Sequence, residues 1–398
     1  MERLWTKPFV QMTLGMLFLF TGFYLLLPTF PLFIKQLGGN ESQVGLTVGM
    51  FTLSAVVFRP AVGVLLDRYG RRPFLFWGLL FFVVSMILYD WAGGIAALLV
   101  LRFFHGASWA FSTTAIGTSI TDVIPPARRG EGMGWSGMAT TAAMAIGPMV
   151  GIWVIQNYSF QLLFIIAACL SAVALLFSVA TKIPYQPKAE AKRLVIFEKS
   201  TLPVTAALFF LTVSYGGITT FLPLFAQSIE VNAGAFFLVY AVTLTLTRPI
   251  AGQLSDRRGE SSVIMVSLLV TMTALFVLIF TRGFAGVIAS AVLYGLGFGA
   301  AQPALQAANL RLAHPEKRGV ATASFMTAFD LGIGLGSIAL GWISQYTGYT
   351  ALFAVCAVSV AASLMIFAAL ARRLLPKNGV SARQKEPGMP QAGRIGSS

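Results

Sequence analysis

The chain has 398 residues, of which 57% are hydrophobic and 11% are charged, and its formal net charge is +14. A soluble domain usually carries about a quarter charged residues, so this composition excludes an ordinary water-soluble protein. The positive charge is compatible with nucleic-acid binding, but Lys and Arg lie in short segments between apolar runs, which is typical of membrane topology.

Apolar segments long enough to cross a membrane recur along the whole chain. A bilayer-crossing helix needs about 20 mostly apolar residues, and we expect twelve of them. In the first half they lie at 10–34, 43–66, 73–91, 94–121, 131–156 and 160–181. In the second half they lie at 201–227, 233–254, 261–281, 284–310, 319–345 and 350–371.

The loops between these segments carry very unequal charge. With twelve crossings, one side of the membrane receives 23 Lys and Arg residues and the other receives only Lys35 and Arg282. Cytoplasmic loops are rich in Lys and Arg. The pattern therefore predicts a multi-pass protein of the cell (inner or plasma) membrane with both termini in the cytoplasm.

The long polar interruptions give the expected domain boundaries. We predict an N-terminal six-helix bundle at 1–181, a cytoplasmic linker at 182–200 and a C-terminal six-helix bundle at 201–373. The polar residues at 374–398 predict a disordered cytoplasmic tail.

The two halves are copies in a single register. Arg59-Pro60 recurs as Arg248-Pro249, and Gly147 recurs as Gly336, each at an offset of 189 residues. Tandem repeats of six spans predict two bundles related by an axis along the membrane normal, with a cavity between them. The predicted fold class is therefore an all-α membrane protein of twelve transmembrane helices in two pseudo-symmetric bundles, which is a transport architecture.

A charged motif follows the second expected span. It contains, in order, Gly63, Asp67, Arg68, Gly70, Arg71 and Arg72. This segment resembles the signature of the major facilitator superfamily, and the resemblance extends over the twelve spans, the six-plus-six repeat and the long middle loop. It implies the major facilitator fold and a transport function.

The same motif has a physical interpretation. Gly63 permits close helix contact and Gly70 permits a tight turn. Asp67 can face the N-terminal end of a helix in the other bundle, while Arg71 can pair with Asp122. Together these residues predict a conformational latch that stabilises the outward-open state; the alternative is that the charges only set topology.

Two charged residues inside expected spans are candidates for proton coupling. Arg102, with Gly106, resembles the fourth-span signature that is linked to proton transfer in proton-coupled members of the superfamily. Asp330 is the only acidic residue well inside a span, and an intramembrane carboxylate is a functional candidate by default. The alternatives are a snorkelling or carbonyl-bonded arginine and a carboxylate that packs between bundles.

The fifth span contains Gly147, Pro148 and Gly151, which resemble the signature that marks antiporters within the superfamily. The two glycines form a small helix face, and the proline removes one helical hydrogen bond. The resemblance favours export over import.

Polar and aromatic residues on shared helix faces are candidates to line the substrate cavity. They are Thr21, Tyr24, Trp109, Thr113, Tyr215, Thr219, Tyr240, Gln302 and Gln306. A lining of aromatic and amide groups with few charges suits an amphiphilic organic molecule. For any single threonine or tyrosine, helix packing is an equally good explanation.

We therefore predict a proton-coupled exporter of small amphiphilic compounds, such as drugs or a self-made metabolite, that works by alternating access. The partners would be a small-molecule substrate, protons and lipid, without nucleic acid, and the protein would be a monomer. No catalytic set, metal cluster or phosphate loop occurs in an aqueous segment, so we expect no enzyme activity, metal or cofactor. The alternatives are a proton-coupled nutrient importer and a non-transporting membrane sensor or lipid-handling protein.

Overall fold

The computed structural model describes residues 3–125, 128–181, 183, 198–314 and 318–374. Nearly all of the predicted linker and tail lie outside these residues. The described part contains helices and no strand.

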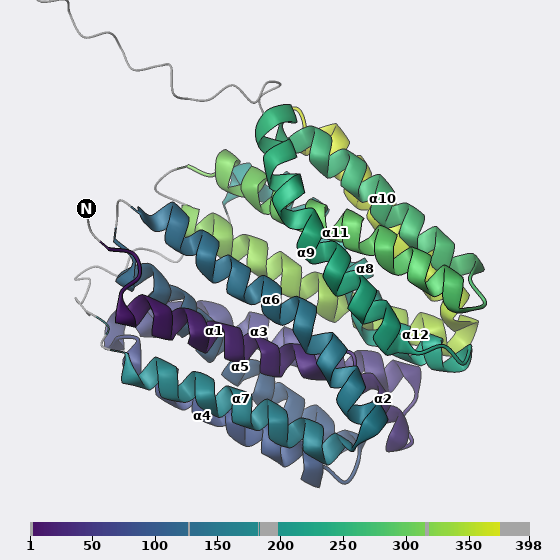
Figure 1. The fold of residues 1–398 in the computed structure, drawn as a ribbon, viewed down its shortest axis with the longest axis horizontal. Coiled ribbons are helices and arrows are strands. Elements are labelled where there is room, and N and C mark those ends of the chain that lie inside the picture. Colours follow the sequence, from purple (N-terminus) through teal and green to yellow (C-terminus); the bar gives the residue numbers. More distant parts are fainter. Residues whose placement is uncertain (1–2, 126–127, 182, 184–197, 315–317, 375–398) are drawn as a thin grey trace, which may run out of the picture.

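The first half of the chain forms the lower bundle in Figure 1. Its helices are α1 (Lys7–Leu26), α2 (Phe30–Gln36), α3 (Glu41–Tyr69), α4 (Arg72–Leu88), α5 (Ile95–Val123), α6 (Arg129–Asn157) and α7 (Phe160–Ala180), with a short 3₁₀ turn at Tyr89–Trp91. α1 packs against α6 and α7, while α5 packs against α3 and α4.

The second half forms the upper bundle, coloured green to yellow in Figure 1. It contains a 3₁₀ turn at Lys199–Thr201, then α8 (Leu202–Ser228), α9 (Ala233–Arg258), α10 (Glu260–Phe280), α11 (Phe284–Leu312) and α12 (Arg318–Ile366), which ends in a π turn at Phe367–Ala371. Its internal packing matches that of the first bundle, since α9 packs against α11 and α8 packs against α12.

Three of the twelve predicted crossings differ from single, separate helices. The first span is split into α1 and α2 around Pro28, a residue that cannot donate the helical hydrogen bond. Conversely, α12 runs over 49 residues, and its rise of roughly 74 Å is more than twice the apolar thickness of a bilayer. It is interrupted at Gly348, whose φ of 82° reverses the chain direction, so it supplies two crossings. The twelve-helix fold is confirmed.

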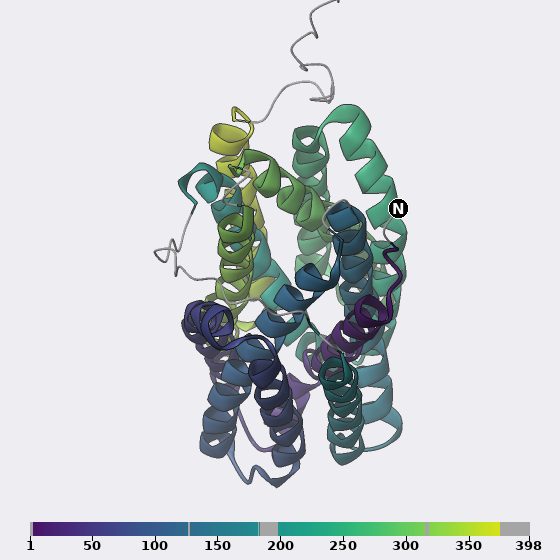
Figure 2. The same ribbon diagram turned by 90° about the vertical axis from the view of Figure 1, so that its left-hand side faces the viewer.

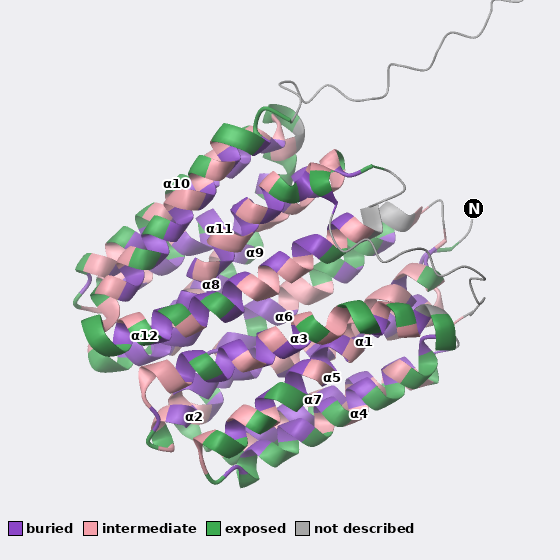
Figure 3. Cartoon of the chain, turned by 180° about the vertical axis from the view of Figure 1, so that it is seen from behind, coloured by how far each residue is buried: buried purple, intermediate pink, exposed green. Residues whose placement is uncertain are grey.

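The outer surface is suited to lipid. Large apolar side chains are exposed there on α4, α7 and α10, among them Phe81, Leu176 and Phe280. Figure 3 shows exposed residues along the outer helices and buried residues on the faces turned inward. Exposed apolar side chains of this size are unfavourable in water and favourable against hydrocarbon.

The bundles meet along two helix pairs, α3 with α12 and α6 with α9. In the view of Figure 2, turned by 90°, the two halves lie one above the other. We use "Glu41 end" for the end of the molecule where α3 begins and "Tyr69 end" for the end where it finishes. The charge pattern predicts that the Tyr69 end is cytoplasmic.

Candidate substrate and coupling site

Contacts between the bundles are concentrated toward the Glu41 end. The Tyr349 hydroxyl donates to Glu41 Oε1 at 3.2 Å, and the Gln156 amide donates to Asn232 Oδ1 at 2.9 Å. Ser42 also bonds to Gln345 through its backbone N–H at 3.2 Å. These bonds join the halves at one end of both helix pairs.

Glycines allow α3 and α12 to approach closely near the same end. A Cβ on Gly45 would lie 2.2 Å from the Ser337 carbonyl oxygen, and one on Gly341 would lie 3.2 Å from the Gly45 Cα. At Gly63, farther along α3, a Cβ would meet nothing within 4 Å. The close contact expected at Gly63 is therefore absent in this structure, and the bundles separate toward the Tyr69 end.

An ion pair bridges the bundles where the α3–α12 contact ends. Arg59 Nη2 of α3 lies 2.5 Å from Asp330 Oδ2 of α12, and each side chain is 17% exposed. Arg59 is roughly 15 Å of helix rise from the end of α3. Asp330, predicted as a coupling candidate, thus has its counter-charge in the other half of the molecule.

A second arginine occupies the equivalent place in the α6–α9 contact. Arg248 of α9 donates to the Thr141 hydroxyl of α6, and its Nη2 lies 3.4 Å from Gln302 Oε1 and 3.9 Å from Met144 Sδ. The repeat offset of 189 residues relates Arg59 to Arg248 and Thr141 to Asp330. The two interfaces therefore have the same geometry, with a carboxylate in one and a hydroxyl in the other.

Several predicted cavity residues gather around Arg248. Gln302 accepts a hydrogen bond from its guanidinium, and the phenols of Tyr24, Tyr215 and Tyr240 lie within electrostatic range of it. The three phenols are nearly fully buried. Helices from both bundles thus bring four of the nine predicted cavity residues to one cation.

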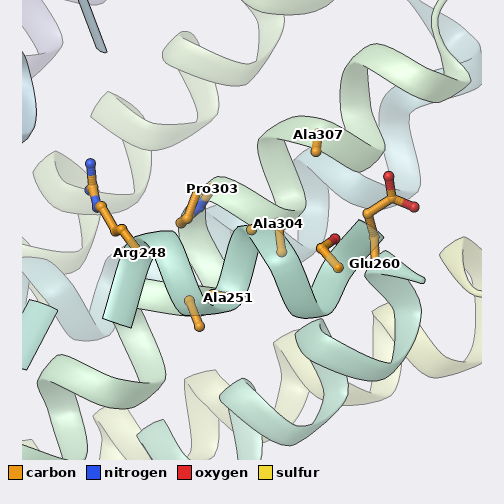
Figure 4. Close-up of a pocket in the computed structure, with 9 residues that line it drawn as sticks. Arg248, Ala251, Glu260, Pro303, Ala304 and Ala307 are labelled. Atoms are coloured by element: carbon orange, nitrogen blue, oxygen red, sulfur yellow. The ribbon is translucent and has the colours of Figure 1, made fainter. Parts of the chain in front are cut away.

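A small cavity lies beside Arg248 between α9 and α11. Its volume is about 160 Å³, and most of its wall is made of small residues such as Ala251, Ala300 and Ala304. In Figure 4, Arg248 and Glu260 lie at opposite ends of this row, and the guanidinium points away from Ala251.

Four of the other five cavity candidates make contacts within their own bundles. Trp109 stacks on Phe23 at 4.3 Å between centroids, inside the first bundle. The hydroxyls of Thr21, Thr113 and Thr219 each donate to a carbonyl four residues earlier in the same helix. Gln306 is half-buried on α11.

The charged motif after α3 forms an ion pair within the first bundle. Arg71 Nε lies 2.8 Å from Asp122 Oδ2, and Arg71 also donates to the Leu66 carbonyl at 3.0 Å. Gly70 ends the helix with a φ of 87°, and Arg72 begins α4. The side chain of Asp67 lies outside what the structure describes, and Arg68 stacks over Tyr69.

The second bundle carries the same pair with its charges exchanged. Arg311 lies 2.8 Å from Glu260. The offset of 189 relates Arg71 to Glu260 and Asp122 to Arg311. The second copy of the motif therefore keeps the link between its two helices although it lacks the terminal basic pair.

Arg102 is enclosed by aromatic rings. It is 3% exposed, and its guanidinium lies 3.6 Å from the centre of the Phe30 ring and 5.4 Å from that of Tyr89. Within the described ranges no carboxylate forms a salt bridge with it. Cation–π contacts stabilise this charge inside the first bundle.

The small face formed by Gly147 and Gly151 packs directly on α1. A Cβ at Gly147 would lie 2.5 Å from the Tyr24 Cβ, and one at Gly151 would lie 2.3 Å from the Leu25 carbonyl oxygen. Pro148 lies within α6 between them. The motif thus fixes the backbone that carries Tyr24, one of the phenols around Arg248.

Arg59 and Arg248 were not among the predicted site residues. A signal for them exists in the sequence, because Arg59, Arg102 and Arg248 are the three cations that fall inside expected spans rather than in loops. Intramembrane cations are functional candidates for the same reason as Asp330.

Twelve crossings in two pseudo-symmetric bundles, with charged groups between them, define a membrane transporter. A family model described as Major Facilitator Superfamily matches residues 12–240 and 228–394. The chain belongs to this superfamily, and it is a multi-pass membrane protein that carries a small molecule.

Two curated relatives are named for export and for drug resistance. The chain is 26% identical to the staphylopine export protein of Staphylococcus aureus (strain Mu50), over 89% of this chain and 93% of the relative. It is 25% identical to the multidrug resistance protein MdtG of Citrobacter koseri, over 89% and 92%.

Solved structures share the fold at low identity. A mutant of the nucleoside transporter NupG matches with a TM-score of 0.73 and 16% identity, over 91% of this chain and 99% of that chain. A bacterial homologue of the human lysosomal transporter Spinster, in an inward-facing and unoccupied conformation, matches with a TM-score of 0.71 and 15% identity, over 92% and 95%.

Proposed function

We propose that this protein is a proton-coupled exporter that moves small amphiphilic organic compounds out of the cell by alternating access. The names of the two curated relatives support the direction of transport. The antiporter-like motif at Gly147–Gly151 supports exchange against protons.

The observation that carries this proposal is the ion pair between Arg59 and Asp330. It is the salt bridge that links the two bundles among the residues described, and it lies within the membrane-spanning part of both helices. Among the described residues, the charged group that contacts Asp330 is Arg59 from α3.

Antiport requires that the transporter does not change its conformation while it carries neither substrate nor proton. An ionised Asp330 holds α12 against Arg59 and so restrains the empty protein. Protonation of Asp330 removes one of the two charges and releases the restraint, so the proton-loaded protein can return. Because the pair is partly buried, losing its attraction has a larger effect than losing a surface pair.

The experiment is dye transport in proteoliposomes with an imposed pH gradient. Rhodamine 6G and sulforhodamine B share a xanthene core and carry opposite net charges, so together they sample amphiphilic cations and anions. An antiporter accumulates dye when the vesicle interior is acidic, whatever its orientation in the vesicle. A symporter accumulates dye when the exterior is acidic, which would establish the importer instead.

Asp330→Asn provides the decisive variant. It should abolish gradient-driven accumulation while dye-for-dye exchange continues, because the amide cannot cycle a proton but leaves the cavity intact. Protein-free vesicles give the passive background. Gradient-driven accumulation by Asp330→Asn at the wild-type rate would exclude Asp330 as the coupling residue.

The predicted latch remains part of the proposal. We place the contact between the Asp67 loop and the other bundle in the opposite, outward-open state; the bonds between the bundles at the Glu41 end support an alternation between two such states. With both termini in the cytoplasm, the open Tyr69 end would receive substrate from inside the cell.

A further inference from the structure

Arg248 lies between the bundles with neutral partners. Its guanidinium contacts a hydroxyl, a thioether and an amide oxygen, from Thr141, Met144 and Gln302. Its Nε is buried without a hydrogen-bond partner. No carboxylate forms a salt bridge with Arg248 in the parts of the chain that the structure describes, and Glu260, at the far end of the neighbouring cavity, is paired with Arg311.

The α3–α12 interface, which is equivalent by the repeat, shows which residue lies opposite the arginine when its charge is balanced. There, Arg59 has Asp330 at 2.5 Å. The residue that the repeat places opposite Arg248 is Thr141, which offers a hydroxyl where the other copy offers a carboxylate. The site thus has the cation of an ion pair but no paired anion among the described residues.

An arginine within the membrane is costly unless an opposite charge or strong hydrogen bonds compensate it. Arg102 meets this requirement with the aromatic rings of its own bundle. Arg248 is instead placed where helices of both halves converge and where the adjoining cavity of about 160 Å³ begins. Its counter-charge is therefore best supplied by a ligand that enters between the bundles.

The groups around Arg248 also fit an anion with an aromatic or apolar body. Its guanidinium offers several N–H donors in a planar fork that matches a carboxylate, sulfonate or phosphate group. The buried phenols of Tyr24, Tyr215 and Tyr240 lie within electrostatic range of the guanidinium, and the adjoining cavity has an apolar wall of alanines and Pro303.

We infer that Arg248, with Thr141 and Gln302, binds the acidic group of the substrate, so that the transported compounds are amphiphilic organic anions. This inference rests on the proposed function and names its substrate class. The acidic group of bound substrate would balance the charge of Arg248 in the α6–α9 interface, as Asp330 balances that of Arg59 in the α3–α12 interface.

The test is direct binding to purified protein in nanodiscs, measured by fluorescence anisotropy with sulforhodamine B and rhodamine 6G. Arg248→Met should weaken binding of the anionic dye by at least about tenfold, which is roughly 1.4 kcal/mol. Thr141→Asp keeps the arginine and supplies the internal carboxylate, so it should weaken anionic dye binding to a similar degree. Neither substitution should weaken binding of the cationic dye.

Arg282→Met is the matched control, because it removes the same charge from a loop where Arg282 donates to the nearby Ile279 and Thr281 carbonyls. It should leave both affinities unchanged. Unaltered binding of sulforhodamine B in Arg248→Met or Thr141→Asp, or no binding of this dye to the wild type, would overturn the inference.

The two proposals fail in different ways. Arg248-dependent binding of sulforhodamine B, without proton-driven movement of either dye, would refute the exporter and leave the anion site. Proton-driven export of rhodamine 6G, with no Arg248-dependent binding of sulforhodamine B, would refute the anion site and leave the exporter.

Discussion

The two interfaces between the bundles descend from one repeated pattern but differ at two points. In the α3–α12 interface, Arg59 meets Asp330 and Gly45 allows contact between backbones. In the α6–α9 interface, Arg248 meets Thr141, and a Cβ on Gly234, the equivalent of Gly45, would lie 3.1 Å from the side chain of Ile152. The first interface is closely packed, and its arginine is neutralised by a carboxylate. The second is looser, and its arginine has no carboxylate partner among the described residues.

This difference suggests a division of labour. The repeat places two arginines at equivalent positions, Arg59 and Arg248. Their partners differ, because Asp330 offers a carboxylate where Thr141 offers a hydroxyl, and we assign the two arginines different roles for this reason. In the proposal, the α3–α12 interface restrains the empty carrier and responds to protons. In the proposal, the α6–α9 interface binds the acidic group of the substrate through Arg248.

Removing Arg59 should produce the largest effect on transport. Arg59→Met leaves Asp330 partly buried without its counter-charge, so gradient-driven dye accumulation should fall by about tenfold or more, since breaking such a pair is strongly destabilising. The charge-exchanged double variant, Arg59→Asp with Asp330→Arg, should recover part of the lost stability of the closed interface. Thermal unfolding and proteoliposome uptake measure the two effects.

A double variant no more stable than Arg59→Met would show that the pair does not act through its mutual attraction. Arg248→Met is a useful comparison, because it removes an arginine that has no carboxylate partner in the described residues. It should be tolerated better in unfolding experiments than Arg59→Met.

Contact between the two bundles at the Glu41 end should depend on Gly45 more than on Gly234, its equivalent in the repeat. A Cβ at Gly45 would lie 2.2 Å from a backbone oxygen, so Gly45→Ala forces α3 and α12 apart at a cost of roughly 1–3 kcal/mol. Gly234→Ala meets only side-chain atoms, and Gly63→Ala meets nothing within 4 Å. Spin labels at the exposed Gln36 and Tyr346 should report a longer distance in Gly45→Ala, a smaller change in Gly234→Ala and none in Gly63→Ala. Equal distances in all three variants would show that the close approach at Gly45 does not control this end.

Much of the fold is predictable from the sequence because a bilayer imposes a length on each crossing helix. The limits of that rule appear at two residues. Pro28 divides the first span into α1 and α2, whereas Gly348 turns the chain without ending the continuous helical pattern of α12. Both the division into twelve crossings and the pairing of the halves followed from apolar runs and the constant offset.

The site is only partly predictable for a different reason. Tyr24, Tyr215, Tyr240 and Gln302 were chosen from helix faces, and the structure brings them together around Arg248. The same criterion selected Trp109, which packs inside one bundle, because a helix face does not reveal which neighbour it meets.

The pairing of residues across the two interfaces cannot be predicted from short-range patterns in the sequence. Asp330 and Arg59 are 271 positions apart, and Thr141 and Arg248 are 107 apart. No spacing along one helix connects them. Only the repeat offset, applied to the intramembrane arginines and to the residues opposite them, could have exposed the exchange of acid for hydroxyl.

The smallest effects are expected where the two halves have exchanged charges, in the pairs near the Tyr69 end. Arg71 is buried beside Asp122, so Asp122→Asn removes the carboxylate from a shielded cation and should lower stability by about 1–2 kcal/mol. Arg311 is about half exposed, and Arg311→Gln removes an attraction that water already screens, so its cost should stay below roughly 1 kcal/mol.

Thermal unfolding in detergent at low and high salt separates the two cases, since salt should reduce the effect of Arg311→Gln more than that of Asp122→Asn. If Arg311→Gln proved the more damaging, the exchanged pair in the second bundle would be the stronger of the two. The lack of a terminal basic pair in the second motif copy would then no longer indicate a weaker link there.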